Sequence, residues 1–413
     1  MKVDIVVIGA SHAGVSFVDA MRSNGFNGSL MLIDRQTGTP LERPPLSKAF
    51  LLEDEDSTNP AFMLRKPDWY NANNVTLKTG ADVTAIDPAG KIVALADGVD
   101  VSYGKLVLAT GAVPRALPPA AGLANVFMLR QPDDAVALRK AAQSAQSAII
   151  IGGGYIGLEV AASLRKRGLE VSVIEAADRL LARVASPPVA ALLGDLHRAH
   201  GVTINTGVVV ASIADKKAAF SGVTLTDGRV LSADMLVVGI GVTPDSQLAR
   251  MAHVETENAD NGAILVDPMM RTSNSDILAI GDVALQRGES LRIESVHNAQ
   301  DSAARAVAGL LDMPPPASQA PWFWSDQYDA KLQSAGIVPT ETDAYDLIHV
   351  SRPGKREGGM SVWTYSGKQL LAVEAVRDPA GYMLGKKCLE ADISPDPDQV
   401  GDPAFDLKAL LAH

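Results

Sequence analysis

The segment Ile149–Ala162 reads IIIGGGYIGLEVAA. An apolar run leads into a glycine-rich turn, Gly152-x-Gly154-x-x-Gly157, and an alanine-containing stretch follows. This order is typical of a strand, a phosphate-binding turn and a helix. The first glycine makes the turn, the second lets the backbone approach a pyrophosphate, and the third lets the helix pack on the strand. Glu175 lies 18 residues beyond Gly157, after the next apolar run, where a carboxylate can accept both ribose hydroxyls. The segment therefore predicts a dinucleotide-binding domain, although a glycine-rich turn that only packs would look similar.

The acid at the end of the second strand also indicates which nicotinamide cofactor binds. The carboxylate of Glu175 repels a 2′-phosphate, and the next two residues, Ala176 and Ala177, offer no guanidinium to receive one. Arg179 is close in sequence and weakens this argument. The pattern favours NADH over NADPH.

A second copy of this pattern stands at the start of the chain, where Val6–Gly14 reads VVIGASHAG. The turn is Gly9-x-Ser11-x-x-Gly14, with serine at the position where the backbone approaches the pyrophosphate, and Asp34 follows 20 residues after Gly14. Two dinucleotide units in one chain indicate an enzyme that passes hydride between two dinucleotides. We expect FAD at the first unit and NADH at the second, with the Ser11 hydroxyl bonding the FAD pyrophosphate.

Bulk composition excludes several classes of protein. The chain has 413 residues, which favours two to three domains, and a net charge of −11, which disfavours binding to nucleic acid or to anionic membranes. Cys388 is the single cysteine, so an internal disulfide, a CxxC redox pair and a thiolate zinc cluster are all impossible. With no apolar run near 18 residues, we expect a cytoplasmic protein without a membrane span. The sequence does not fix the oligomeric state, and a monomer is the default expectation.

The remaining segments predict the rest of the architecture. Residues 105–118, 233–249 and 271–284 contain buried strands that end in glycine, and the Pro-rich residues 312–321 form a linker. Residues 360–377 predict two antiparallel strands around a Ser-Gly turn, and residues 401–413 predict a helix. The predicted fold is α/β, with two Rossmann-like dinucleotide-binding domains and a C-terminal α+β domain that carries an antiparallel sheet. The predicted domains are residues 1–114 with 244–318 for FAD, 115–243 for NAD, and 319–413.

Several motifs, in collinear order, resemble the FAD-dependent ferredoxin reductases that serve bacterial aromatic-ring dioxygenases and cytochromes P450. They include RPPLSK at residues 43–48, IGGGYIGLEVAA at 151–162, RTSNSDILAIGD at 271–282, PWFWSDQYDAKLQSAG at 321–336 and LLAVEAV at 370–376. The resemblance implies a glutathione-reductase-like fold. It also implies hydride transfer from NADH to FAD and then single-electron transfer to a [2Fe–2S] ferredoxin that feeds an oxygenase or a cytochrome P450.

The patterns and the resemblance together predict the cofactor-binding residues. Those for FAD are Gly9, Ser11, His12, Ala13, Gly14, Asp34, Arg35, Arg43, Lys48, Val83, Ala109, Thr110, Gly111, Arg130, Asp282, Val296 and Trp324. Those for NAD are Gly152, Gly154, Tyr155, Ile156, Gly157, Glu159, Glu175 and Gly241.

The resemblance also implies three catalytic residues. It places Lys48 beside the isoalloxazine, Glu159 at the nicotinamide entrance and Trp324 over the flavin face away from NADH. We expect Lys48 and Glu159 to form an ion pair, because a buried lysine needs an acidic partner. The alternative is a surface lysine with an ordinary helix glutamate, and Trp324 as a core residue.

Three other functions stay open at this point: a rubredoxin reductase, a diaphorase-like NADH:quinone reductase, and an FAD-binding signalling protein of the apoptosis-inducing-factor type. A metal centre is not predicted. His197 and His200 are three residues apart but no third ligand is evident, so we expect both on a helix surface.

Overall fold

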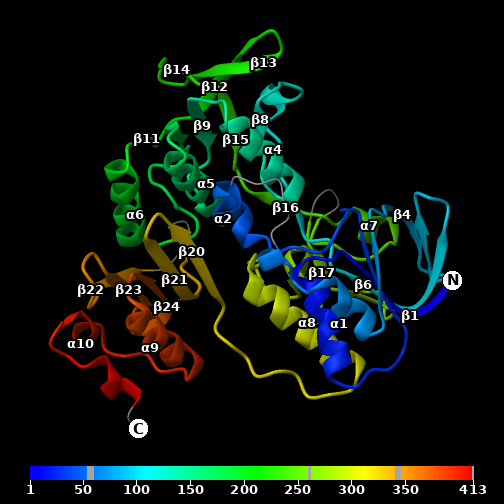
Figure 1. Ribbon diagram of the computed structural model, residues 1–413. Helices are drawn as coiled ribbons and strands as arrows, with labels where there is room; N and C mark the ends of the chain where they lie inside the picture. The colour runs from blue at the N-terminus through cyan, green and yellow to red at the C-terminus, as the bar shows by residue number, and fades with distance from the viewer. Residues whose placement is uncertain (54–59, 259–261, 340–345, 412–413) are drawn as a thin grey trace. The chain divides into compact units, whose positions relative to one another are not determined.

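The computed structural model describes residues 1–53, 60–258, 262–339 and 346–411 (Figure 1). The chain divides into two compact units, each built from segments that are far apart in sequence. The first unit comprises the described residues of Met1–Arg43, Ser57–Val113 and Val242–Ala317. The second comprises those of Pro44–Asp56, Pro114–Gly241 and Ser318–His413.

A seven-stranded sheet forms the centre of the first unit. Its order is β3-β2-β1-β6-β5-β4, and β18 pairs with the carboxyl half of β6. The parallel strands are β1 (Lys2–Ile8), β2 (Leu30–Asp34), β3 (Val75–Thr79), β6 (Asp100–Leu108) and β18 (Ile277–Ala279), and the antiparallel hairpin is β4 (Val83–Asp87) with β5 (Ile92–Leu95). Parallel neighbours end at the same edge of a sheet, so the residues after β1, β2, β6 and β18 come together there.

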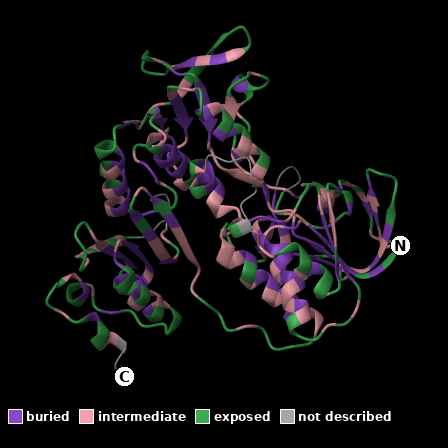
Figure 2. Ribbon diagram, in the orientation of Figure 1, coloured by how far each residue is buried: buried purple, intermediate pink, exposed green. Residues whose placement is uncertain are grey.

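Helices and short strands complete the first unit. Helix α1 (His12–Ser23) packs beside α8 (Val296–Leu310), and Figure 1 shows the two side by side. The other elements are α3 (Pro67–Ala72), α7 (Gln247–Met251), the 3-10 helices η2 (Pro60–Phe62) and η4 (Gly281–Val283), and the strand pairs β17 (Ile264–Val266) with β19 (Ala284–Gln286) and β7 (Ala112–Pro114) with β16 (Val242–Pro244). Figure 2 shows the central strands in the buried colour, as expected for continuous apolar strands covered on both faces.

A five-stranded parallel sheet forms one part of the second unit. Its order is β11-β10-β9-β15-β8, from β8 (Val126–Phe127), β9 (Ser147–Ile151), β10 (Glu170–Ile174), β11 (Val202–Asn205) and β15 (Met235–Val238). Its helices are α4 (Pro132–Ala142), α5 (Tyr155–Lys166) and α6 (Pro187–Ala199). An antiparallel sheet of β12 (Val210–Lys216), β13 (Ala219–Leu225) and β14 (Val230–Ser232) and the 3-10 helix η3 (Pro118–Ala120) accompany it.

An antiparallel sheet forms the other part of the second unit. Its order is β20-β21-β24-β23-β22, from β20 (Trp322–Gln327), β21 (Ala330–Gly336), β22 (Leu347–Pro353), β23 (Met360–Ser366) and β24 (Gln369–Val376). Helix α9 (Pro379–Glu390) packs on β21 and β24, and α10 (Pro397–Gly401) and η5 (Leu407–Leu411) follow. This unit also contains η1 (Pro44–Ser47) and α2 (Ala49–Leu52), which contacts α5.

Most of the predicted architecture is confirmed. The α/β fold class is confirmed, the β23–β24 hairpin has the predicted antiparallel pairing, and residues 312–321 contain no helix or strand. The predicted helix at residues 401–413 is wrong within the described residues, where α10 ends at Gly401 and only the 3-10 helix η5 follows. Asp402 and Asp406 accept bonds from the backbone N–H groups of Ala404 and Lys408, which gives the backbone an alternative to a helix. The three-domain division stays a prediction.

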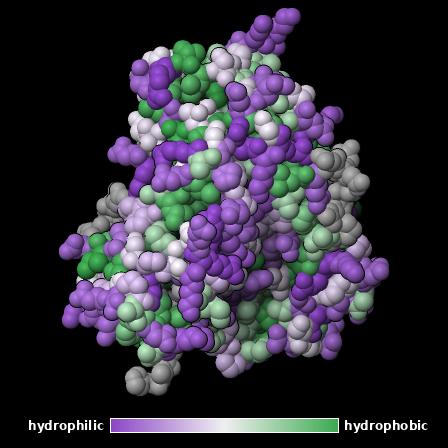
Figure 3. All heavy atoms as spheres, turned by 60° about the vertical axis from the view of Figure 1, so that its left-hand side comes forward, coloured by the Kyte–Doolittle hydropathy of each residue, from purple (hydrophilic) through white to green (hydrophobic). Residues whose placement is uncertain are grey.

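The described residues form no helix with the length and apolar character that a membrane crossing requires. On the face drawn in Figure 3, hydrophilic side chains predominate, and apolar residues form small groups among them.

The C-terminal segment depends on one arginine of β22. The Arg352 guanidinium donates to the carbonyl oxygens of Val400 (2.9 Å), Asp402 (2.6 Å) and Phe405 (2.6 Å). It also donates to the carbonyl oxygen of Pro403 (3.3 Å). We expect Arg352→Ala to destabilise this segment by about 1–3 kcal/mol, because four carbonyl groups lose a charged donor. Hydrogen exchange at residues 400–405 should accelerate, whereas the exposed Arg356→Ala should leave it unchanged. Equal exchange in both variants would contradict this role.

Candidate functional site

The turn after β1 has two glycines that the backbone itself requires. Gly9 has φ +107°, and a Cβ there would lie 2.2 Å from the carbonyl oxygen of Ala109. A Cβ on Gly14 would lie 1.9 Å from the carbonyl oxygen of Gly9. Ser11 is the N-cap residue of α1 and has an extended backbone. It can therefore carry a side chain, whereas Gly9 and Gly14 cannot.

The Ser11 side chain bonds an arginine instead of capping its helix. Arg43 Nε donates to Ser11 Oγ (3.2 Å), and Arg43 Nη2 donates to Gln36 Oε1 (2.7 Å). A guanidinium therefore lies at the centre of the turn, beside the first backbone N–H groups of a helix. Both groups attract anions, so this part of the structure fits a pyrophosphate.

The acid after β2 is bonded to the same turn. Asp34 Oδ2 accepts from the Ala10 N–H (2.6 Å), and Oδ1 accepts from the Gln36 N–H (2.8 Å). Its neighbour Arg35 pairs with Asp245 (3.0 Å), whose carbonyl oxygen accepts from Thr110 Oγ1 (2.6 Å). The structure thus brings the predicted residues after β1, β2 and β6 together at one edge of the sheet.

The loop after β18 reaches the same edge. A Cβ on Gly281 would lie 2.9 Å from Cβ of Ala13, and the Gly281 N–H donates to Ser302 Oγ (3.0 Å). Asp282 is therefore held beside the amino end of α1, where His12 is buried. Val296 is the first residue of α8. The predicted residue Val83 lies apart from this group in sheet order, at the start of the edge strand β4.

The turn after β9, in the second unit, repeats the geometry with a glycine in place of serine. Gly152 has φ +112°, its Cβ would lie 2.2 Å from the carbonyl oxygen of Gly239, and a Cβ on Gly157 would lie 2.1 Å from that of Gly152. Gly154 differs, because a Cβ there would meet no protein atom within 4 Å and its φ is −79°. Packing does not explain this glycine, whereas close approach by a pyrophosphate does.

Glu175 holds the second turn as Asp34 holds the first. Its Oε2 accepts from the Gly153 N–H (2.7 Å), and its Oε1 accepts from the Ala177 N–H (2.8 Å). Gly241 follows β15 with φ +100°. These residues fit the ribose and pyrophosphate of a dinucleotide.

The other predicted residues of the second unit have different surroundings. Tyr155 donates to the carbonyl oxygen of Val184 (3.2 Å), and burial raises the pKa of its hydroxyl well above the usual value. Ile156 is exposed. Arg130 precedes α4, and its N–H donates to Asp134 Oδ2 (3.0 Å).

A buried carboxylate on α5 gathers donors from three parts of the second unit. Glu159, 4% exposed, accepts from Lys48 Nζ (2.7 Å) and from Ser47 Oγ through Oε2, and from Ser325 Oγ (2.6 Å) through Oε1. Lys48 Nζ also donates to the carbonyl oxygen of Pro44 (3.0 Å). The predicted ion pair between Lys48 and Glu159 is therefore confirmed as a contact.

Strand β20 has two faces with different side chains, because successive residues of a strand point to opposite sides. On one face, Phe323 lies 4.5 Å from the Tyr155 ring and Ser325 bonds Glu159. On the other face, the rings of Trp322 and Trp324 lie 5.6 Å apart, and both are half-buried. The motif WFWSDQ thus combines contacts to the nucleotide-binding fold with an aromatic pair.

Sequence reasoning missed the polar residues around Glu159 and misplaced one histidine. Ser47, Ser325, Gln327 and His197 are all buried. His197 is 0% exposed, so its expected position on a helix surface is wrong, whereas His200 is exposed. Burial in contact with β20 lowers the pKa of His197 to about 4. No local sequence pattern marks these four residues.

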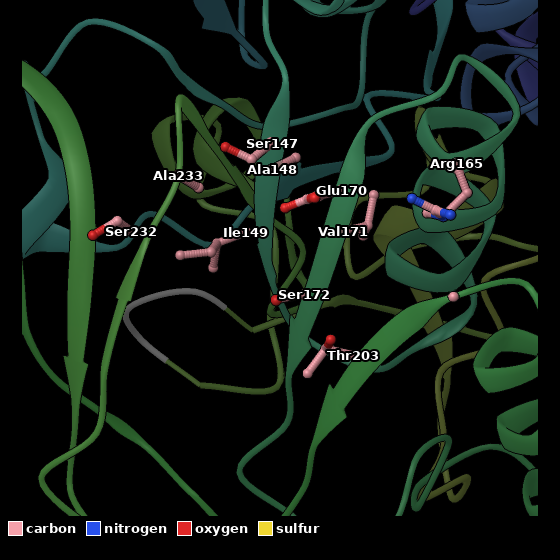
Figure 4. A pocket seen from close by; sticks show the side chains of 11 residues that line it. Ser147, Ala148, Ile149, Arg165, Glu170, Val171, Ser172, Thr203, Ser232 and Ala233 are labelled. Carbon is pink, nitrogen blue, oxygen red and sulfur yellow. The ribbon is translucent and has the colours of Figure 1, made fainter.

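A cavity of about 370 Å³ lies elsewhere in the second unit (Figure 4). Its lining includes Ser147, Glu170 and Ser172, from the beginnings of β9 and β10. Ligands of parallel sheets bind outside the carboxyl ends of the strands, where Gly152 and Glu175 lie. This cavity at the opposite edge is therefore not the dinucleotide site.

Comparisons with known proteins agree with this geometry. Residues 3–303 match the family model for pyridine nucleotide-disulphide oxidoreductases, and residues 322–411 match the model for the reductase C-terminal domain. The chain belongs to the pyridine nucleotide-disulphide oxidoreductases and, within them, to the ferredoxin reductases. FAD and NAD(H) are characteristic of this family, so the predicted family, the flavoprotein oxidoreductase class and the cofactors are confirmed.

Individual relatives match nearly the whole chain. Rhodocoxin reductase of Rhodococcus erythropolis is 40% identical over 416 residues, which cover 99% of this chain and 94% of that protein. The solved ferredoxin reductase for the CYP199A2 system from Rhodopseudomonas palustris is 38% identical, with a TM-score of 0.92 and coverage of 99% and 100%. The solved covalent putidaredoxin reductase–putidaredoxin complex is 36% identical, with a TM-score of 0.91 and coverage of 99% and 98%.

Ser11 gives a direct test of the first turn. We expect Ser11→Gly to retain FAD, because the extended backbone and the space at the turn persist. Ser11→Leu should lose most of its FAD, because the larger side chain occupies the position of close approach. The ratio of flavin to protein absorbance after purification measures both. Ser23→Leu, at the exposed end of α1, is the control and should keep its FAD. Normal FAD content in Ser11→Leu would show that this turn does not bind the pyrophosphate.

A second buried carboxylate predicts a pH dependence of stability. Glu374 accepts from the Ser186 N–H (3.0 Å), and burial raises its pKa from 4.5 to about 7. Because the pKa of Glu374 is raised in the folded state, the contribution of this group to the free energy of unfolding is fully present below pH 4.5. That contribution is lost as pH rises through 7.

Glu374→Gln removes this titration. The Tm of the wild type relative to Glu374→Gln should therefore fall by about 2–6 °C between pH 5 and pH 8. The exposed Glu357→Gln should show no such trend. A pH-independent difference between wild type and Glu374→Gln would contradict the raised pKa.

Proposed function

We propose that this protein is an NADH-dependent reductase of a [2Fe–2S] ferredoxin that feeds an oxygenase or a cytochrome P450. One observation carries the choice within the family: the chain has a single cysteine, Cys388, and it is buried. A disulphide reductase that uses protein thiols needs a redox pair, which this chain lacks. The named relatives include a rhodocoxin reductase and a reductase solved in complex with its putidaredoxin.

The two turns support separate roles for the two dinucleotides. When bound, NADH supplies a two-electron hydride donor, and FAD supplies a carrier that can release electrons singly. The first turn, with Ser11 and Arg43, holds its cofactor by an additional side-chain donor and a positive charge. The second turn presents a bare glycine at the same place, which suits a cofactor that exchanges in every cycle.

Glu175 supports NADH as the reductant. Its Oε2 accepts from the Gly153 N–H of the turn and its Oε1 from the Ala177 N–H, and Ala177 stands where a 2′-phosphate would need a cation. A carboxylate at this position repels that phosphate.

We propose that Lys48 and Glu159 position the nicotinamide and that Trp324 packs the flavin on its other face. The Lys48 side chain is 16% exposed, and Glu159 and a backbone carbonyl hold its ammonium group in a fixed position. Such a charge stabilises an electron-rich ring without moving during the reaction. We also propose that the protein acts in the cytoplasm, where a lone buried thiol stays reduced.

A stopped-flow experiment tests the acceptor. Rapid bleaching of the flavin by NADH, followed by reoxidation only with added [2Fe–2S] ferredoxin, is the expected result. Reoxidation by rubredoxin or quinone at the same rate would favour those alternatives. Reduction without turnover by any acceptor would favour a binding protein.

A substitution of the ion pair tests the site. Glu159→Gln and Lys48→Met should each slow flavin reduction by NADH on the order of 10²-fold, because the nicotinamide loses its fixed charges. Lys48→Met should also destabilise the fold by about 3–5 kcal/mol, because it leaves a buried carboxylate unpaired.

The control is Lys78→Met, which removes the exposed pair with Asp97. It should change stability by less than about 0.5 kcal/mol and leave flavin reduction unchanged. Reduction at the wild-type rate in Glu159→Gln would exclude the proposed role of this pair.

A further inference from the structure

Glu159 is the end of a continuous chain of buried polar side chains that reaches helix α6. Ser325 Oγ bonds Glu159 Oε1 (2.6 Å), Gln327 Nε2 bonds Ser325 Oγ (3.2 Å), and His197 Nε2 bonds Gln327 Oε1 (2.9 Å). Each of these four residues is at most 4% exposed. The chain therefore joins α5, β20 and α6 inside the second unit.

The direction of every hydrogen bond in this chain follows from its first member. An ionised carboxylate only accepts, so Ser325 donates its single hydrogen to Glu159. The Ser325 oxygen then accepts from the amide nitrogen of Gln327, which leaves the Gln327 oxygen to accept from His197. His197 must carry its proton on Nε2, and its Nδ1 is left to accept from the Tyr328 hydroxyl (3.4 Å).

We propose that His197 is a positioning residue that orients the Glu159 carboxylate, through Gln327 and Ser325, for the reaction at the pyridine nucleotide. This inference rests on the proposed function of Glu159. The lowered pKa of His197, caused by burial, agrees with the neutral form that the chain requires.

The chemistry of the chain favours orientation over proton transfer. An amide has distinct donor and acceptor ends and does not exchange protons readily, so Gln327 interrupts any proton path. The same asymmetry lets Gln327 fit in only one way between an acceptor hydroxyl and a donor imidazole. Apolar side chains would fill this packing without the risk of an unpaired polar group, so a satisfied polar chain indicates a constraint on Glu159.

Charged and titratable groups lie at both ends of the chain. Lys48 faces Glu159 from the segment after η1, and Tyr155 lies on the same helix with Glu374 of β24 near it. At the other end, the Tyr328 ring stacks on His200 at 3.7 Å, and the His200 N–H donates to the carbonyl oxygen of His197 (3.1 Å). Arg165 of α5 also lies at this end, where its Nε donates to the carbonyl oxygen of His200 (2.9 Å).

The experiment uses the FAD-loaded enzyme and measures the rate of flavin reduction by NADH in the stopped flow over a range of NADH concentrations. His197→Phe, Gln327→Leu and Ser325→Ala should each lower the limiting rate by about tenfold to a hundredfold. The NADH concentration that gives half of the limiting rate should change by less than about twofold, because these residues orient the carboxylate and leave the nucleotide-binding turn unchanged. His197→Gln retains an N–H donor and should restore the wild-type limiting rate.

Matched measurements separate this role from a structural one. His349→Phe replaces a histidine of the same unit that bonds Thr364 on the C-terminal sheet, and it should leave the limiting rate of flavin reduction unchanged. Tm and FAD content are measured for every variant, and Ser325→Ala, the smallest change, serves where a larger substitution fails to fold.

Three outcomes would count against the inference or its premise. If Glu159→Gln slows reduction while the three chain variants keep the wild-type limiting rate, the inference is wrong and the proposed function stands. If Glu159→Gln itself reduces flavin at the wild-type rate, the proposed role of Glu159 fails first. A lower Tm with an unchanged limiting rate would mean that the chain only supports packing.

Discussion

A buried carboxylate, Glu159, determines how the second unit is assembled. A charge that is 4% exposed is destabilising by several kcal/mol unless donors satisfy it. Ser47 and Lys48 come from the start of the chain and Ser325 from its C-terminal third, and the carboxylate itself lies on the helix of the second turn. None of these segments can leave without exposing an unpaired charge, so one acid links the nucleotide-binding fold to the C-terminal sheet.

The two dinucleotide turns use the same backbone and differ at one position. In both, the outer glycines are required because a Cβ would meet a backbone carbonyl oxygen within about 2 Å. In both, an acid after the second strand accepts a bond from an N–H of the turn. Only the middle position is free of these constraints, and there the two turns diverge to Ser11 with Arg43 and to Gly154. The difference therefore concerns the ligand and not the fold.

The sequence was sufficient for features that depend on local spacing. The apolar runs, the turn glycines, the two acids and the C-terminal hairpin follow from periodicity and from the geometry of parallel strands. The pair of Lys48 with Glu159 followed from the family resemblance and from the need to neutralise a buried lysine. His197, Ser325 and Gln327 could not be assigned, because the bonds from Ser325 to Glu159 and from His197 to Gln327 each join residues more than a hundred positions apart, and no local pattern marks them. The helix predicted for residues 401–413 was wrong for a different reason. Aspartate side chains there compete for the backbone N–H groups that a helix would use.

The alternation of side chains along β20 makes this strand intolerant of insertion. Phe323, Ser325 and Gln327 face the nucleotide-binding fold, whereas Trp322 and Trp324 face the opposite way. Adding or removing one residue within β20 would turn the side chains on one side of the change to the opposite face of the strand. Insertions and deletions should therefore be tolerated in the preceding Pro-rich linker, where the chain is irregular. Within β20, only substitutions that preserve the character of each face should be tolerated. Six consecutive residues thus supply both the contacts to the nucleotide-binding fold and the aromatic pair. Each face can be redesigned without changing the other.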